Sequence, residues 1–193
     1  MALILASSSA IRRAMLDAAD VGYDAIPPQV DEDSIKLRLR DGASVAARLA
    51  EAKAHDVSKG READWVVGSD SVVSVDDRLF DKPRSREEAA EHLRVFSGKQ
   101  MRLTSAVAIA RAAELQWVHV ETAILHVRPL SDHFIESYLD AEWPEVGYCV
   151  GVFRMEGRGV QLFDRIDGDY FTILGMPLVP LLGALRERGL LPA

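Results

Sequence analysis

Short apolar runs alternate along this chain with longer stretches in which apolar residues recur at helical spacing. The short runs predict strands at residues 2–6, 22–26 and 65–75. The longer stretches predict helices that start near residues 10, 44, 85, 131 and 176. Strands that alternate with helices in this way are typical of an α/β fold.

Two pairs of strands have the pattern of hairpins. The run that ends at Val75 turns at Asp76-Asp77-Arg78 into Leu79-Phe80. Residues 101–111 and 115–127 are β-rich and are joined by Ala112-Ala113-Glu114, which predicts an antiparallel pair. The stretch from Gly147 to Gly168 is rich in glycine and predicts loops suited to closing a site.

Helix starts are marked by hydroxyl and acidic residues. Ser9, Ser85 and Ser131 precede predicted helices, and Ser85 begins a Ser-x-x-Glu capping box. Asp33 or Ser34 would serve the same purpose for a helix after Pro27-Pro28. The last helix is expected to hold Pro177 in its first turn.

One carboxylate lies within the most apolar strand. The run from Trp65 to Val75 reads Trp-Val-Val-Gly-Ser-Asp-Ser-Val-Val-Ser-Val, and Asp70 is its only acid. We expect the buried run to end at Asp70, at the rim where ligands bind in open α/β sheets, and then to resume through Val72, Val73 and Val75. Taken alone, a strand-end Asp that caps a turn is the simpler interpretation.

The start of the first helix has the features of an anion site. Ser7-Ser8-Ser9 joins the first strand to this helix, so free backbone N–H groups and the positive end of the helix dipole point at one place. Arg12 and Arg13 lie in the first turn, where a cation is unfavourable unless an anion binds nearby. Both are therefore candidate phosphate-binding residues, although two solvated arginines would give the same pattern.

Further charged residues fit a phosphate and metal site. Glu32 lies in the acidic run Asp31-Glu32-Asp33, which either caps a helix or helps to hold a divalent cation. Lys53 borders the buried stripe of an Ala-rich helix, where a lysine reaches solvent or acts as a point charge on phosphate. Lys82 precedes Pro83, which restricts its direction.

Composition narrows the classes of function. The length of 193 residues suits one domain. The net charge of −7 disfavours binding to polymeric nucleic acid. No stretch is apolar enough to span a membrane, and the N-terminus lacks a basic leader, so we expect a cytoplasmic protein. Cys149 is the only cysteine and is interpreted as a small apolar residue. His119 and His126 fall on opposite faces of one strand and are not interpreted as metal ligands.

Together these residues suit phosphoryl chemistry. Such reactions are catalysed mainly by positioning of the reactants and by cations that stabilise charge on the phosphate oxygens, with a carboxylate that holds a metal ion or orients water. The motifs of P-loop, dinucleotide-binding and serine-hydrolase folds are absent from the sequence. An aspartyl-phosphate phosphatase would want a second acid two residues after Asp70, where Val72 stands.

Several blocks of the chain together resemble the Maf family of nucleoside triphosphate pyrophosphatases. They occur in the family's order over nearly the whole chain: Leu5-Ala6-Ser7-Ser8-Ser9-Ala10-Ile11-Arg12-Arg13, Ala50-Glu51-Ala52-Lys53-Ala54, Gly68-Ser69-Asp70-Ser71-Val72-Val73, Lys82-Pro83, Ser97-Gly98, Glu156-Gly157, Gly168-Asp169-Tyr170 and Leu174-Gly175-Met176-Pro177-Leu178. The resemblance implies an elongated α/β fold of the ITPase-like kind, with a mixed sheet flanked by helices. It also implies a single domain over residues 1–193 whose two lobes flank a central substrate cleft.

The same resemblance implies an activity and its residues. The reaction is hydrolysis of a nucleoside triphosphate to its monophosphate and pyrophosphate, a house-cleaning role in the nucleotide pool that uses a divalent cation, Mg²⁺ or Mn²⁺. Asp70 matches the catalytic carboxylate that activates water and, with Glu32, the acidic groups that hold the metal. Positions that match the family's phosphate contacts are Ser7, Ser9, Arg12, Lys53 and Lys82.

Departures from the family pattern bear on the substrate. The members that act on dTTP and UTP carry an arginine where Ile11 stands, and tend to have Tyr and Gln in place of Phe153 and Glu156. With Ser71 beside Asp70, this pattern is more similar to the branch that acts on 7-methyl-GTP. A carboxylate such as Glu156 would accept hydrogen bonds from a guanine edge and favour the positive charge of a methylated ring.

Two alternatives remain at this point. One is a pyrophosphatase of the dTTP and UTP type, and the other is a nucleotide-binding regulator of cell division and septum formation. The expected partner in every case is a small-molecule nucleoside triphosphate, and a homodimer is possible.

Overall fold

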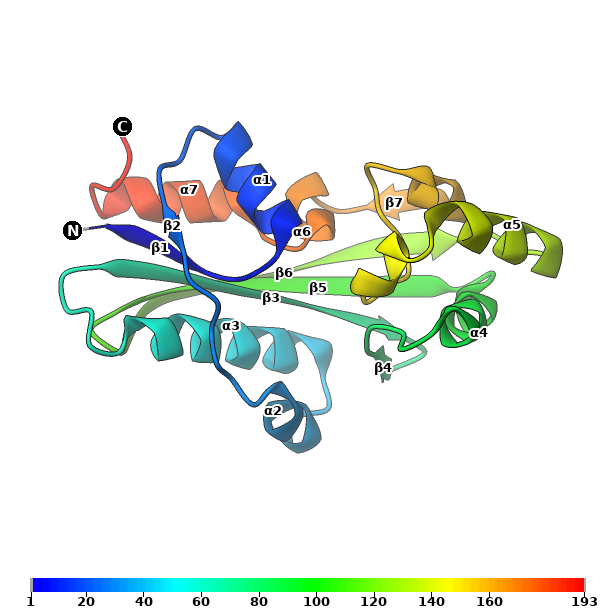
Figure 1. Cartoon of the computed structure of the whole chain (residues 1–193), viewed down its shortest axis with the longest axis horizontal. Helices are drawn as coiled ribbons and strands as arrows, with labels where there is room; N and C mark the ends of the chain where they lie inside the picture. Colours follow the sequence, from blue (N-terminus) through cyan, green and yellow to red (C-terminus); the bar gives the residue numbers. More distant parts are fainter. Residues whose placement is uncertain (1, 193) are drawn as a thin grey trace. The chain divides into compact units, whose positions relative to one another are not determined.

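The computed structural model describes residues 2–192. Within them the chain forms a mixed seven-stranded sheet in the order β2-β1-β3-β5-β6-β7, with β4 beside β3 (Figure 1). The strands are β1 (Leu3–Ala6), β2 (Asp24–Ala25), β3 (Trp65–Val75), β4 (Arg78–Phe80), β5 (Gln100–Arg111), β6 (Glu114–Val127) and β7 (Phe163–Asp167). The helices are α1 (Ala10–Ala18), α2 (Glu32–Arg38), α3 (Gly42–Ser58), α4 (Arg86–Phe96), α5 (Asp132–Glu142), α6 (Tyr170–Leu174) and α7 (Leu178–Glu187), with short 3-10 helices at Glu145–Tyr148 and Arg158–Leu162. The expected α/β class and mixed sheet are confirmed.

Two compact units divide the chain. Unit 1 holds the residues up to Ser71, Thr104–Glu121 and those from Asp169 onward, and unit 2 holds Val72–Leu103 and Thr122–Gly168. Strands β3, β5 and β6 contribute residues to both units. In the described part of the chain, no helix is long and apolar enough to cross a membrane.

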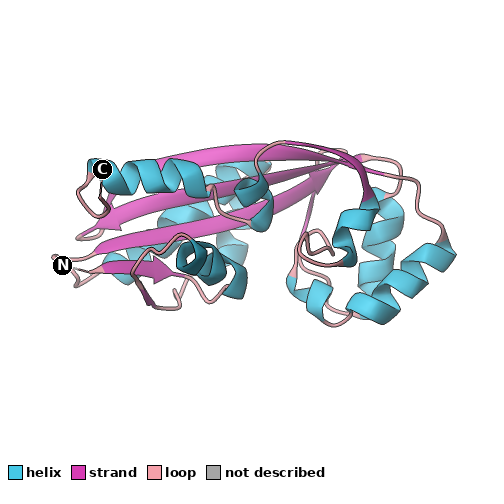
Figure 2. Ribbon diagram, turned by 90° about the horizontal axis from the view of Figure 1, so that it is seen from above, coloured by secondary structure: helices cyan, strands magenta, loops and turns pink. Residues whose placement is uncertain are grey.

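The sheet of unit 1 is covered by helices on both faces (Figures 1 and 2). Strand β1 pairs in parallel with β2 and β3. Because side chains alternate along a strand, Leu5 and Val67 pack on the face that holds Met15 of α1 and Leu181 of α7. Ile4 and Val66 lie on the opposite face, with Val57 of α3.

Strand β3 differs from the expectation in one respect that matters for the site. Asp70 does not end the strand: it lies in the middle of eleven continuous strand residues. The edge of β3 nevertheless changes partner there, because β1 leaves the ladder at Gly68 and β4 joins it at Val73. Asp70 therefore lies beside the carboxyl end of β1, which is where ligands bind in sheets of this kind.

Most predicted helix starts are confirmed. The hydroxyls of Ser9, Ser85 and Ser131 each accept a hydrogen bond from a backbone N–H of the first turn. The prediction for α2 was wrong, because its cap is Asp31 rather than Asp33 or Ser34. The Asp31 carboxylate accepts from both the backbone N–H and the hydroxyl of Ser34, so the cap lies two or three residues earlier than predicted.

In unit 2, the predicted hairpin between β3 and β4 is present, and Asp76 and Asp77 adopt the left-handed conformation that its tight turn requires. Helices α4 and α5 are joined by the Arg86 guanidinium, which donates to Glu136 at 2.8 Å and to Asp140 at 2.6 Å. The long pair β5 and β6, whose turn lies in unit 1, is also as predicted, with Ala112 and Ala113 at positive φ in that turn.

A histidine lies in the aromatic core of unit 2. His92 of α4 is 8% exposed and contacts the rings of Phe80 and Phe96. Its Nδ1 has no hydrogen-bond partner among the described residues, and Glu88 lies 3.9 Å from its Nε2. Burial lowers the pKa of His92 below its ordinary value of 6.5, so the folded protein favours the neutral ring.

Acidification should therefore destabilise the protein through His92. The unfolded chain takes up this proton at an ordinary histidine pKa, whereas the folded chain resists it. The contribution is complete above pH 6.5 and is lost as the pH falls through and below that value. Urea midpoints of the wild type should fall between about pH 7.5 and 5.5, and those of His92→Phe should fall less. His133→Gln, at an exposed histidine, is the control and should behave as the wild type; equal slopes for all three proteins would contradict the assignment.

Candidate active site

Helix α3 lies unusually close to β3, and Gly68 is the reason. A Cβ atom on Gly68 would lie 2.2 Å from the backbone oxygen of Ala50 and 2.5 Å from the backbone nitrogen of Ala54. Only glycine allows the backbones to approach this closely. Asp70 lies two residues further along the same face of β3, so the close approach brings α3 alongside its carboxylate.

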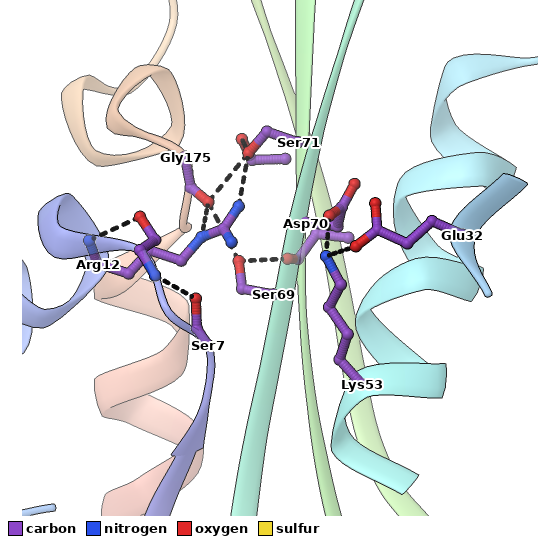
Figure 3. Close-up of polar contacts among 11 residues, drawn as sticks. Ser7, Arg12, Glu32, Lys53, Ser69, Asp70, Ser71 and Gly175 are labelled. Atoms are coloured by element: carbon purple, nitrogen blue, oxygen red, sulfur yellow. Dashed lines mark hydrogen bonds and ion pairs between the residues drawn. The ribbon is translucent and has the colours of Figure 1, made fainter. Parts of the chain in front are cut away.

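Three charged side chains meet on this face (Figure 3). The Lys53 ammonium, from α3, lies 2.5 Å from Asp70 Oδ1 and 2.8 Å from Glu32 Oε1. One cation is thus shared by two carboxylates that come from a strand and from the first turn of α2. Lys53 is more deeply buried than its place at the edge of the apolar stripe predicts, with 7% exposure.

The cluster is open to solvent mainly at Glu32. The side chains of Lys53 and Asp70 are 9% and 11% exposed, whereas that of Glu32 is 40% exposed. Helix α2 has no buried residue, and its Leu37 is 86% exposed. Buried charges persist only when they are paired, so the two carboxylates and the ammonium depend on one another.

The opposite face of β3 carries hydroxyl groups and an arginine. Ser69 and Ser71 flank Asp70 in the sequence and therefore point away from it. The Arg12 guanidinium, from α1, donates from Nε to the carbonyl oxygen of Gly175 at 3.0 Å and from Nη2 to Ser71 Oγ at 3.2 Å. Figure 3 shows Arg12 on one side of β3 and Lys53 with Glu32 on the other.

The carbonyl group of Gly175 is the anchor of this second cluster. Gly175 follows α6 with a φ of 106°, a left-handed conformation that suits glycine. Its oxygen lies 3.1 Å from Ser69 Oγ and 3.0 Å from Ser71 Oγ in addition to the Arg12 contact. The turn after α6 thereby positions the guanidinium group.

A chain of hydroxyls continues from Ser71 into the core. Ser71 Oγ lies 2.9 Å from Ser105 Oγ, and Ser105 donates to the carbonyl of Thr172 at 2.8 Å. Ser105 uses its one hydrogen on that carbonyl, so it can only accept from Ser71. The single hydrogen of Ser71 is therefore directed either to Ser105 or to the carbonyl of Gly175. Ser105 was not predicted, because a serine within an apolar strand has no distinctive spacing. Its complete burial in the structure explains why its hydroxyl needs a hydrogen-bond partner.

The start of α1 has the expected arrangement. Ser7 Oγ accepts from the backbone N–H of Ser9 at 3.1 Å, and Ser9 caps the helix. Burial lowers the pKa of Arg12, while the negative charges of Asp70 and Glu32 oppose the shift. Among the described residues, the direct partners of this half-buried guanidinium are neutral groups, so its further N–H donors suit an anion.

The structure places the other predicted residues as follows. Arg13 is exposed and Ile11 is half-buried, both on α1. Lys82, Phe153 and Glu156 belong to unit 2. Phe153 is 6% exposed and packs edge-on against Phe163, whereas Glu156 is more open and lies 3.6 Å from Arg154.

The lone cysteine is not activated. Burial raises the pKa of Cys149 to about 11, with a smaller contribution from Glu156. Its thiol is therefore protonated at neutral pH and is a poor nucleophile.

Among residues 2–192, no three His, Cys, Asp or Glu side chains form a cluster that could hold a metal ion. The available carboxylate pair is Glu32 and Asp70, which share Lys53. Two carboxylates complemented by phosphate oxygens and water are an ordinary donor set for Mg²⁺. The chemistry of this pair therefore fits a divalent cation that a phosphate ligand helps to hold.

Comparison with known proteins assigns the chain to a family. The model of the Maf-like protein family matches residues 2–188. The chain belongs to the Maf-like family. A relative in Rhizobium meliloti named 7-methyl-GTP pyrophosphatase is 47% identical over 99% of this chain and 98% of that protein.

Other Maf-like relatives carry a broader name. A nucleoside triphosphate pyrophosphatase of Nitrobacter hamburgensis is 46% identical over 98% of this chain and 95% of that protein. Among solved structures, a HAM1 protein from Coxiella burnetii gives a TM-score of 0.43 at 12% identity, over 65% of this chain and 72% of that one.

The close approach at Gly68 leads to a testable prediction. Gly68→Ala should lower the free energy of unfolding by about 2–3 kcal/mol, because the added methyl group collides with the backbone of α3. The collision should also push α3 away from β3, which would separate Lys53 from Asp70 and lower the pyrophosphatase activity. Urea unfolding and a pyrophosphate-release assay measure the two effects.

The matched control is Gly183→Ala in α7, where an added Cβ meets nothing within 4 Å. Its stability should equal or exceed that of the wild type by up to about 1 kcal/mol. A Gly68→Ala protein as stable and active as this control would disprove the packing argument.

Proposed function

We propose that this protein hydrolyses a nucleoside triphosphate to the monophosphate and pyrophosphate. The observation that carries the proposal is the shared ion pair of Asp70, Lys53 and Glu32 beside the end of β1. The names of relatives with more than 40% identity over nearly the whole chain support the same activity.

The polyphosphate would bind at the start of α1. Backbone N–H groups after Ser7, together with the dipole of α1, favour an anion at that place. Arg12 supplies guanidinium donors that its contacts with Ser71 and Gly175 hold in a fixed direction. Lys53 supplies a second cation, and Lys82 keeps the phosphate-binding role that its motif predicts.

Asp70 would act on the attacking water. The carboxylate accepts a proton from water as the water oxygen bonds to the α-phosphorus. The bond between that phosphorus and the oxygen that bridges to the β-phosphorus breaks, and pyrophosphate leaves with the bonding electrons. Arg12 and Lys53 would stabilise the negative charge that grows on the phosphate oxygens.

Glu32 and Asp70 are the residues that would hold a divalent cation, Mg²⁺ or Mn²⁺. Such an ion, when bound, neutralises phosphate charge and polarises the reacting phosphate. The chain's own contribution is to hold both carboxylates within reach of one ligand. Asp70 is held by β3, and Glu32 by the first turn of α2.

A 7-methylguanine base is the substrate feature that we favour. The Rhizobium meliloti relative bears the name 7-methyl-GTP pyrophosphatase. In addition, Ile11 stands at the position where the family members that act on dTTP and UTP carry an arginine. Glu156 would accept hydrogen bonds from the guanine edge and favour its positive charge. The buried Phe153 would support the loop that carries Glu156 rather than stack on a base.

Asp70→Asn should reduce turnover while the protein stays folded. The amide removes the proton acceptor but preserves the size of the side chain, so kcat should fall by about a hundredfold to ten-thousandfold. The assay follows pyrophosphate and nucleoside monophosphate together, with circular dichroism as the check of folding. Asp77→Asn, in the exposed turn after β3, is the matched control and should leave kcat unchanged. Retention of wild-type turnover by Asp70→Asn would refute the role of this carboxylate.

A screen of purified enzyme over canonical and methylated triphosphates tests the base preference. We expect kcat/KM for 7-methyl-GTP to exceed that for dTTP by at least about tenfold. Glu156→Gln should reduce this ratio, whereas Glu145→Gln, at an exposed glutamate, should preserve it. Strong turnover of dTTP with none of 7-methyl-GTP would reject the preference.

A further inference from the structure

Lys53 lies between the two carboxylates that would hold a divalent cation. Its nitrogen lies 2.5 Å from one oxygen of Asp70 and 2.8 Å from one oxygen of Glu32. The three groups together carry one net negative charge. The lysine therefore serves as the counter-ion of its own site.

This arrangement disfavours binding of the metal ion without the triphosphate, and binding of the triphosphate without the metal ion. A bare metal ion would have to enter beside a buried ammonium, and like charges repel strongly where water is scarce. A bare triphosphate would face Asp70 and Glu32 across the same small space. Neither ligand satisfies all three groups.

The complex of metal and triphosphate satisfies all three. Its cation replaces the ammonium on the carboxylates, and its phosphate oxygens receive the ammonium that has been displaced. The four-carbon stem of Lys53 allows this exchange without movement of α3. Because Glu32 is the most exposed member of the cluster, the complex has access from that side.

We propose that Lys53 makes this site select the metal–triphosphate complex over the free metal ion and over the free triphosphate. The proposal rests on the proposed function, since it concerns the same carboxylates. Lys53 then has two partners in sequence: the carboxylates before binding and the phosphate after it.

Binding of Mn²⁺ alone to the full chain, measured by electron paramagnetic resonance without nucleotide, tests the proposal. Lys53→Met keeps the length of the side chain and removes its charge, so Mn²⁺ should bind roughly tenfold more tightly or better than to the wild type. Lys53→Arg keeps the charge and should bind Mn²⁺ as weakly as the wild type. Lys59→Met removes an exposed lysine at the end of α3 and should also resemble the wild type.

A second measurement uses only the wild type and covers the case in which Lys53→Met fails to fold. An α,β-methylene triphosphate, which resists hydrolysis, should raise the affinity for Mn²⁺ by about tenfold or more, and Mn²⁺ should raise the affinity for the analogue by the same factor. In a folded Lys53→Met protein this mutual effect should be smaller.

Equal Mn²⁺ affinity in the wild type and a folded Lys53→Met protein would overturn the proposal, as would independent binding of Mn²⁺ and analogue to the wild type. These readouts are separate from turnover. If the wild type hydrolyses no triphosphate but shows the expected Mn²⁺ affinities, the proposed function fails while the selective role of Lys53 stands.

Discussion

The site depends on one ammonium group that two carboxylates share. Lys53 has little contact with solvent, and so does Asp70, so neither charge is tolerable without the other. The pairing is possible only because α3 and β3 approach closely at Gly68. A glycine without any chemistry of its own therefore sets the distance on which the charged groups depend.

The alternation of side chains along β3 places two groups of polar residues on opposite faces of the strand. Asp70 faces α3, while Ser69 and Ser71 face the elements that hold Arg12. A single strand thus carries the carboxylate cluster on one face and the guanidinium cluster on the other. The point at which β1 leaves the ladder is the place along the edge of β3 where both clusters occur. Because Arg12 and Asp70 lie on opposite faces, the guanidinium bonds to Ser71 and Gly175, while the carboxylate pairs with Lys53.

Local patterns in the sequence predict much of this structure. Alternation and helical spacing identify the strands and most helices, and the serines before α1, α4 and α5 mark where those helices begin. The motifs also single out Asp70, Lys53, Glu32 and Arg12 as charged groups of interest. The ion pairs themselves lie beyond such patterns, because they depend on packing between segments far apart in the chain.

The features that were predicted wrongly or not at all also depend on contacts between distant segments or on backbone groups. Asp70 was expected to end the buried run because ligands bind at strand ends in open sheets, but Lys53 pairs with the carboxylate and β3 continues without interruption. The short α6 and the carbonyl of Gly175 escaped notice, since a backbone acceptor leaves no trace in the side-chain pattern. Ser105 was overlooked because a serine in a strand has no distinctive spacing.

The shallow seating of α2 has a consequence for the solution behaviour of the enzyme. A helix without any fully buried side chain gains little from the hydrophobic effect, so polar contacts such as the bond between Glu32 and Lys53 matter more for its attachment to α3. Dissolved ions weaken attraction between partly exposed charges. Concentrated salt should consequently loosen α2 before it disturbs the sheet, so that Glu32 separates from Lys53 while the strands remain intact.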